Sequence, residues 1–181
     1  MTLDKAIKEN KEDLKIFIGY YEQKLNNKDF KYIYRKFKNF YSAAAFTSAF
    51  TALLLKNNIN PLKYMDEVPE YFAYGLDIED FVIPNNITKI LSCAFEDCSI
   101  LTNITIGSGT THIYNSAFSN CERLASITIP KSIVYIGRGA FRNCSKLKDI
   151  YYEGSEEDWK NIEIEWWCNE LLRNVNIHYN S

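Results

Sequence analysis

A repeat of 23 residues in the second half of the chain constrains its fold more than any other feature. Phe95, Phe118 and Phe141 lie 23 residues apart, and the same residue types surround each of them. Relative to each Phe these are Ile at −5, Ala at −1, Cys at +3, Leu at +6 and Ile at +9. A fixed period of this length is typical of a solenoid, in which stacked coils bury each other's apolar faces.

Each repeat ends in an alternating segment that predicts a β-strand. These segments are 104–106, 127–129 and 150–152, and they consist of β-branched and aromatic residues in alternation. Strands one repeat apart should pair in parallel. The short Ala-Phe-x-x-Cys segment predicts a single turn of α- or 3₁₀-helix. A weaker copy of the pattern over 68–83, centred on Phe72, predicts a degenerate first repeat.

Residues 1–64 carry no trace of the repeat and predict a small helical domain. Apolar residues recur there at helical spacing, beginning with Leu3, Ile7 and Leu14. The uncharged segment 41–55 predicts a buried helix, because a membrane span needs about 20 apolar residues. Asn60 and the Pro after it predict the start of a further short helix.

The segment after the last repeat predicts a cap on the open end of the solenoid. Ser155 is a good helix N-cap, and the acidic residues that follow suit a first helical turn. Trp159, Trp166 and Trp167 supply a large apolar area, which we expect to cover the last coil. Alternation over 175–179 predicts a final strand.

The repeat resembles the BspA-type leucine-rich repeat family. Units of that family follow the pattern Ile-Pro-x-x-Val-x-x-Ile-x-x-x-Ala-Phe-x-x-Cys-x-x-Leu-x-x-Ile. Segments 83–106 and 129–152 match this pattern closely. The middle repeat departs from it with Gly107 in place of Pro and Thr110 in place of Val or Ile. Segment 152–159 is similar to a capping segment common in that family.

The resemblance implies a leucine-rich-repeat solenoid with a binding role and no catalytic residues. The expected fold class is α+β. A helical domain over 1–67 also forms the N-terminal cap, repeats over 68–152 build a parallel β-sheet, and 153–181 form the C-terminal cap. Many relatives are surface proteins with export signals. This chain differs from them because its first residues are polar and predict no signal peptide.

The two parts of the chain differ in charge. Residues 1–64 hold 12 Lys or Arg and 6 Asp or Glu, a net of +6, whereas 65–181 hold 9 and 17, a net of −8. Self-association through these opposite charges is one hypothesis. Segment 28–38 interleaves cations with aromatic residues, which suits nucleic acid or an acidic partner, but an amphipathic helix with a solvated basic side is the favoured interpretation. The cations concerned are Lys31, Arg35, Lys36 and Lys38.

The five cysteines predict reduced thiols. Cys98, Cys121 and Cys144 occupy one repeated position, where a small apolar side chain packs well. Parallel side chains on stacked coils do not give good disulfide geometry. Together with the polar first residues, this pattern predicts a cytoplasmic protein with free thiols.

The sequence offers no good catalytic or metal-binding constellation. It has no Cys-x-x-Cys pair and no glycine-rich phosphate loop, so we expect no metal, no cofactor and no enzymatic activity. Cys168 and His178 are the one Cys-His pair worth weighing as a nucleophile and base. The favoured interpretation is that Cys168 packs in the cap while His178 faces outward from the last strand.

We expect the chain to bind a protein partner through the outward side chains of its strands. The candidate residues are Asn103, Thr105, Ser126, Thr128, Asp149 and Tyr151. Two alternatives remain open. One is an intracellular inhibitor encoded by a phage or mobile element, resembling an anti-CRISPR protein and blocking a host enzyme or defence complex in the host cytoplasm. The other is nucleic-acid binding through the basic N-terminal helices.

Overall fold

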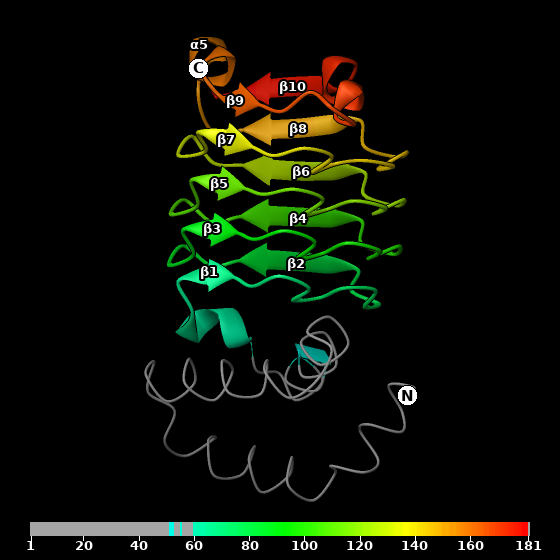
Figure 1. The fold of residues 1–181 in the computed structure, drawn as a ribbon. Coiled ribbons are helices and arrows are strands. Elements are labelled where there is room, and N and C mark those ends of the chain that lie inside the picture. Colours follow the sequence, from blue (N-terminus) through cyan, green and yellow to red (C-terminus); the bar gives the residue numbers. More distant parts are fainter. Residues whose placement is uncertain (1–50, 53–54, 56–59, 181) are drawn as a thin grey trace, which may run out of the picture.

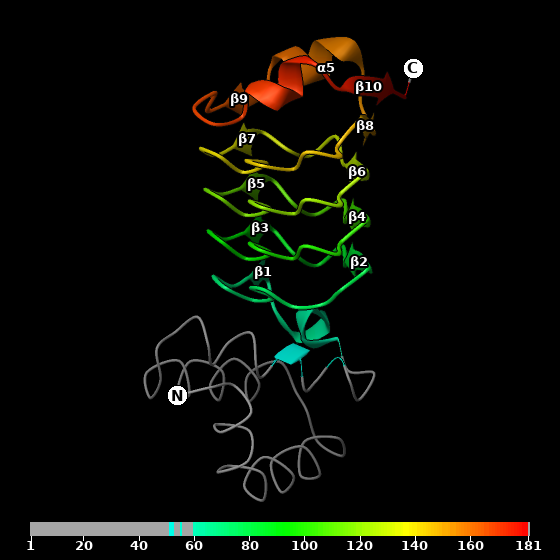
Figure 2. The same cartoon turned by 90° about the vertical axis from the view of Figure 1, so that its right-hand side faces the viewer.

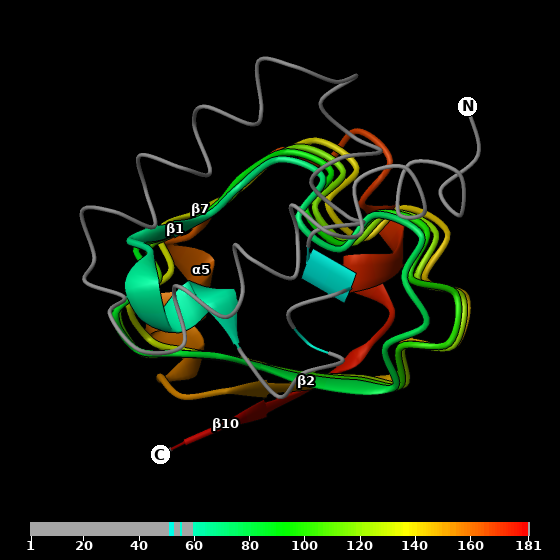
Figure 3. The ribbon, with the colours of Figure 1, turned by 90° about the horizontal axis from the view of Figure 1, so that it is seen from below.

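The computed structural model describes residues 51–52, 55 and 60–180. Residues 67–179 form a solenoid with two parallel sheets (Figure 1), which lie on opposite sides of its core (Figure 3). The wide sheet has four-residue strands: β2 (Asp80–Ile83), β4 (Asn103–Ile106), β6 (Ser126–Ile129), β8 (Asp149–Tyr152) and β10 (Asn176–Tyr179). The narrow sheet has two-residue strands: β1 (Glu67–Val68), β3 (Lys89–Ile90), β5 (His112–Ile113), β7 (Tyr135–Ile136) and β9 (Glu163–Ile164). The described part also contains three short helices, η1 (Pro61–Tyr64), α5 (Glu156–Lys160) and η2 (Glu170–Arg173), and residues 51, 52 and 55 are helical as well.

The strand register confirms the 23-residue period. In the wide sheet, Ile104 pairs with Ile127 and Ile127 with Ile150. The degenerate first repeat is also confirmed, because Phe81 pairs with Ile104 in the same register. The narrow sheet was not predicted, since strands of two residues are too short for alternation to reveal them.

A column of phenylalanine rings runs through the core, as the repeat predicts. The ring centroids of Phe95 and Phe118 are 5.4 Å apart with an interplanar angle of 14°, and those of Phe118 and Phe141 are 5.4 Å apart at 11°. All three side chains are fully buried. Figure 3 shows the backbones of the coils superimposed along the solenoid axis, which agrees with the stacking of Phe95 on Phe118 and of Phe118 on Phe141.

The Ala-Phe-x-x-Cys segment is a hydrogen-bonded turn, and the predicted helical turn was wrong. Alternate backbone N–H groups donate to the next coil: Phe95 N to Ala117 O at 2.7 Å and Asp97 N to Ser119 O at 2.9 Å. These donors are not available for a helix. Residues two before and two after each Phe adopt the left-handed backbone conformation, at φ 58° for Cys93 and 62° for Asp97. Positive φ at both positions bends the chain away from a helical path.

The buried cysteines join the coils to one another. The thiol of Cys98 donates to Ala73 O at 3.0 Å, and that of Cys144 donates to Phe118 O at 3.1 Å. Burial raises the pKa of Cys98 to about 12. All five cysteines of the chain are free in the structure, which agrees with the prediction of unpaired thiols.

Both departures of the middle repeat from the family pattern have a steric or hydrogen-bonding cause. A Cβ at Gly107 would lie 2.6 Å from the carbonyl carbon of Pro84, so a side chain cannot be accommodated at that position. Thr110 is fully buried, and its hydroxyl donates to Ile87 O at 3.1 Å. The coil contact therefore satisfies the hydroxyl that replaces an apolar side chain.

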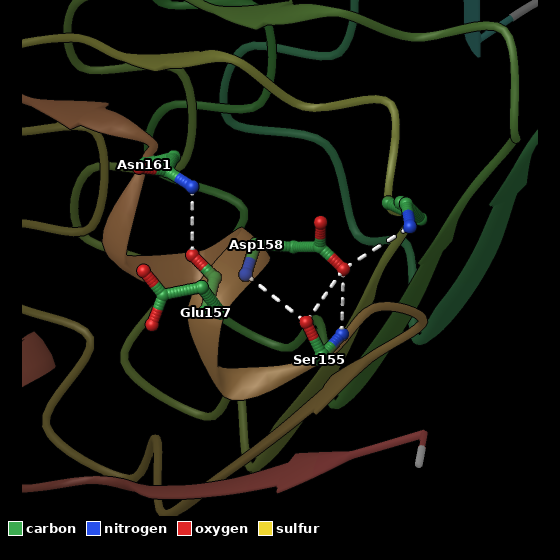
Figure 4. Close-up of polar contacts among 5 residues, drawn as sticks. Ser155, Glu157, Asp158 and Asn161 are labelled. Atoms are coloured by element: carbon green, nitrogen blue, oxygen red, sulfur yellow. Dashed lines mark hydrogen bonds and ion pairs between the residues drawn. The ribbon is translucent and has the colours of Figure 1, made fainter.

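The C-terminal cap begins as predicted, with Ser155 as the N-cap of α5. The Ser155 hydroxyl accepts from Asp158 N at 3.1 Å, while the Asp158 carboxylate accepts from Ser155 N at 3.0 Å and forms an ion pair with Lys131 at 3.1 Å (Figure 4). This is a reciprocal capping box. Hydrogen bonds from the Ser155 backbone and hydroxyl, followed by the contact with Lys131, lower the pKa of Asp158 to about 2.

Only one of the three tryptophans packs in the core, so the prediction for the other two was wrong. Trp159 is buried, and its ring lies edge-on to Tyr152 at 5.1 Å. Trp166 and Trp167 are 41% and 64% exposed. Each carries an arginine guanidinium on its face: Arg173 lies 4.6 Å from the Trp166 ring centroid, and Arg138 lies 4.5 Å from that of Trp167.

At the N-terminal end of the described region, η1 covers the first coil. Asn60 caps this 3₁₀-helix by accepting from Leu62 N at 3.0 Å, as the Asn-Pro sequence predicts. Leu62 is fully buried, and Asn86 from the first coil donates to its carbonyl at 2.8 Å. The helices predicted within 1–50 lie outside the described residues.

Replacement of Phe118 by Ala tests the ring column. The middle ring loses contacts on both faces and leaves a cavity, so we expect the free energy of unfolding to fall by about 3–5 kcal/mol in urea titrations. Val134→Ala is the control, because Val134 is 53% exposed and its loss should change the free energy by less than about 0.5 kcal/mol. Equal effects of the two variants would contradict the stacked core.

Replacement of Ser155 by Ala tests the capping box and should cost about 1 kcal/mol of stability at pH 7. The pKa of Asp158 is lowered from 3.8 to about 2, so its stabilising contribution is complete above pH 3.8 and is lost as the pH falls toward 2. We therefore expect thermal melts of the wild type to lose stability over this range more steeply than those of Ser155→Ala. Parallel pH profiles would contradict the assignment.

Thiol reactivity tests the burial of the cysteines. Burial, followed by the influence of Glu96, raises the pKa of Cys93 to about 12, and the repeated cysteines are shielded from solvent. A disulfide reagent at pH 8 should therefore react slowly with these four cysteines in the native protein, whereas Cys168 is only partly buried and is not protected in this way. After denaturation without reductant the reagent should react with five thiols per chain. Fewer than five would indicate disulfides that the structure does not contain.

Candidate functional site

The outer face of the wide sheet is the candidate functional site, and strand pleating positions its side chains. Alternate residues of each strand enter the core, which leaves two outward positions per strand. The six predicted residues all occupy these outward positions. The outward residues are Asp80, Val82, Asn103, Thr105, Ser126, Thr128, Asp149, Tyr151, Asn176 and His178.

Asp80, Val82 and Asn176, outward residues of the two terminal strands, were not predicted; His178 was expected to face outward and does, but it was not assigned to the binding face. Asp80 and Val82 lie one 23-residue period before Asn103 and Thr105, so the degenerate repeat contained the signal that could have found them. Asn176 and His178 pair with Asp149 and Tyr151 at an offset of 27 residues. The cap is inserted between β8 and β10 and changes the offset from 23 to 27 residues, so the repeat alone could not show that Asn176 and His178 lie beside Asp149 and Tyr151.

One outward position of each strand carries a polar side chain, and these side chains form a polar ladder in two parts, over β2, β4 and β6 and over β8 and β10. The Asn103 side-chain amide donates to the Asp80 carboxylate at 2.9 Å, and the Ser126 hydroxyl donates to Asn103 Oδ1 at 2.7 Å. At the other end, the Asn176 amide donates to the Asp149 carboxylate at 3.2 Å. These contacts hold the side chains in place before any partner arrives, which reduces the entropy lost on binding.

The second outward position changes from aliphatic to aromatic along the sheet. Val82 is 63% exposed at one end, and Tyr151 is 49% exposed toward the other. The rings of Tyr151 and His178 stack with centroids 4.8 Å apart, and His178 Nε2 lies 2.8 Å from Asp149 Oδ1. The hydrogen bond from His178, followed by the one from Asn176, lowers the pKa of Asp149. The result is an ordered aromatic and charged corner on the face.

A shallow, open depression lies on the face at the β2 and β4 end. Its volume is about 340 Å³, and it is lined by Asp80, Phe81, Val82, Asn103 and Thr105. Its apolar lining comes from Phe81 and Val82, and its polar groups are Asp80 and Asn103 of the ladder together with Thr105. Such a hollow can receive one side chain of a partner.

The other sequence-derived candidates are not brought together. His178 contacts Asp149 and Tyr151 on the wide sheet, whereas Cys168 lies beside Gly139, whose added Cβ would be 3.5 Å from that of Cys168. Within the described residues, no three His, Cys, Asp or Glu side chains gather closely enough to hold a metal ion. The basic candidates Lys31, Arg35, Lys36 and Lys38 lie outside the described residues.

The family model described as the BspA type leucine-rich repeat region, in six copies, matches residues 66–181. The chain belongs to the BspA-type leucine-rich repeat family. Repeats of this kind generally mediate protein–protein interaction, and their solenoid is typically a non-enzymatic binding scaffold. Membership therefore agrees with a surface, rather than a pocket, as the functional site of this leucine-rich repeat protein.

Two crystal structures of leucine-rich repeat proteins are similar to this chain. The leucine-rich repeat protein of T. pallidum is 32% identical, with a TM-score of 0.39, over 40% of this chain and 34% of that one. A leucine-rich cell surface protein from Faecalibacterium prausnitzii is 25% identical, with a TM-score of 0.30, over 49% and 35%. The chain thus spans about a third of the length of each. None of the curated proteins matches the sequence.

Across the described residues, no helix combines the length and the hydrophobicity that crossing a membrane requires.

Proposed function

We propose that this leucine-rich repeat protein binds a protein partner on the outer face of the wide sheet. The observation that supports this most is the polar ladder, in which side chains with no place in the core are already fixed by hydrogen bonds across neighbouring strands. Because these donors and acceptors are already fixed, binding a partner costs little additional side-chain entropy.

Tyr151 is the proposed energetic centre of this face. Its ring is half exposed and stacks on His178, so one side is held while the other is free to contact a partner. Tyrosine is favoured at binding hot spots because it offers a large rigid area together with a polar group. The depression beside Val82 would receive a partner side chain at the opposite end of the face.

Simultaneous replacement of Thr105, Thr128 and Tyr151 by Ala tests the proposal. The partner is first recovered by affinity capture from the native cell and identified by mass spectrometry, and binding is then measured with purified components. We expect the triple variant to lose binding and to keep a melting temperature near that of the wild type. Tyr151→Ala alone should weaken binding by about 30-fold, or 2 kcal/mol.

A matched control lies on the opposite side of the solenoid. Lys89, Val134 and Glu163 are exposed residues in or beside the narrow sheet, and their replacement by Ala removes a comparable number of side chains. Binding should survive in this control. If the control loses binding while the first variant retains it, the site lies on another surface.

The other functional hypotheses stay predictions. A phage-encoded inhibitor of a host complex would also use a protein-binding face, and gene neighbourhood tests that origin. Nucleic-acid binding through Lys31, Arg35, Lys36 and Lys38 would appear as salt-dependent retention on DNA. The cytoplasmic location and self-association through opposite charges likewise await measurement.

A further inference from the structure

β10 is an edge strand with free hydrogen-bonding groups. It is the terminal strand of the wide sheet, and β8 is its one paired neighbour among the described strands. Asn176 N donates to Lys148 O at 2.7 Å, and Asn180 N donates to Tyr152 O at 3.1 Å. Because backbone groups alternate in direction along a strand, the N–H groups of Ile177 and Tyr179 face away from β8. They point toward the free edge.

The apolar columns of the wide sheet continue into β10 but are only partly covered there. Ile127 and Ile150 are almost fully buried, whereas Ile177, next in the same column, is only partly buried at the edge of the core. Tyr179 extends the second column in the same way beyond Tyr152. Figure 2 shows α5 beside β10, and no described strand pairs along its outer edge.

β10 also lacks the features that usually protect an edge. Its sequence, Asn-Ile-His-Tyr, contains no Pro, Lys, Arg, Asp or Glu, and the strand has no bulge in its pairing with β8. Natural sheets generally block exposed edges with such residues or bulges. The opposite end of the solenoid is different, because Leu62 of η1 is fully buried against the first coil.

The surroundings of this edge are acidic. Residues 153–180 contain seven acidic and two basic residues, a net charge of −5. Glu153 follows β8 at the level of Asn180, and burial together with the nearby Glu156 raises the pKa of Tyr179. Glu170 is exposed in η2, before the start of β10. Carboxylates therefore outnumber cations in the segment that contains the edge strand, although Lys160 pairs with Glu156 at 2.9 Å and Arg173 lies between Glu170 and β10 in the sequence.

We propose that the free edge of β10 binds an extended cationic segment of a partner protein as an additional β-strand. The N–H groups and carbonyls of Ile177 and Tyr179 would pair with the backbone of that segment. Its alternate apolar side chains would pack beside Ile177 and Tyr179, the last residues of the two apolar columns. Its Lys or Arg side chains would form ion pairs with carboxylates of residues 153–180. This site is distinct from the outer face of the wide sheet and does not rest on its proposed function.

Charge favours a cationic segment over a second copy of the chain. Antiparallel pairing of two β10 strands would bring together two copies of the segment 153–180, each with a net charge of −5. Like charges in such a contact oppose association. A basic extended segment encounters no such repulsion.

The test uses a synthetic six-residue peptide, Lys-Ile-Lys-Val-Lys-Ile, with blocked ends, and its counterpart in which Glu replaces every Lys. We expect the full chain to bind the lysine peptide at least about tenfold more tightly than the glutamate peptide in fluorescence anisotropy. We also expect hydrogen exchange of the Ile177 and Tyr179 amides to slow by about tenfold or more when the lysine peptide is bound. Equal affinities, or unchanged exchange at both amides, would overturn the proposal.

Ile177→Pro removes one outward N–H while sparing the hydrogen bonds to β8, and edge strands tolerate proline in this orientation. It should weaken peptide binding by about tenfold, whereas Ile177→Val should bind as the wild type does. The triple variant of the outer face should bind the peptide normally, which separates this site from that one. If Ile177→Pro fails to fold, the exchange measurement on the wild type decides. A wild-type dimer with these amides already protected would show that the edge pairs with a second copy.

Discussion

Hydrogen bonding and ring packing between successive coils hold this structure together, and no coil could fold without a neighbour. The backbone N–H groups of Phe95 and Phe118 donate to the next coil and that of Phe141 donates to the Asn169 side chain of the cap, so the turns satisfy their polar groups only when the following segment is present. The rings of Phe95, Phe118 and Phe141 stack on one another along the solenoid axis. The buried thiols donate to carbonyls of the preceding coil. Polar and apolar contacts thus impose the same register, which is why residues 23 positions apart must share their type.

The candidate binding face is a consequence of that register. Once every second strand residue is committed to the core, the remaining side chains line up at fixed spacing on the outside, where packing no longer restricts their identity. In this chain they form hydrogen bonds from strand to strand and end in the stacked pair of Tyr151 and His178 beside Asp149. A rigid core therefore presents a surface that can vary among members of a leucine-rich repeat family without loss of the fold.

Both ends of a solenoid need a cap, because the first and last coils each have a neighbouring coil on one side only and would expose the apolar face on the other. Leu62 and the capped η1 provide it at one end. At the other, the capping box of α5 and the buried Trp159 cover the interior, but β10 keeps an unpaired edge and partly exposed apolar side chains. That incomplete coverage, within an acidic segment, makes the C-terminal end a second surface with its own chemistry.

The sequence alone determined the period, the wide sheet with its outward residues, the N-caps at Asn60 and Ser155 and the degenerate first repeat, because each depends on local alternation or a local hydrogen bond. Only the tertiary structure decided the narrow sheet, the turn at each Phe and the exposure of Trp166 and Trp167. The narrow strands are too short to leave a pattern, and the turns donate to a neighbouring coil instead of along the chain. The two tryptophans lie under arginines rather than in the core, and His178 meets Asp149 across an insertion that interrupts the period. Such contacts join residues distant in sequence, so only the folded chain reveals them.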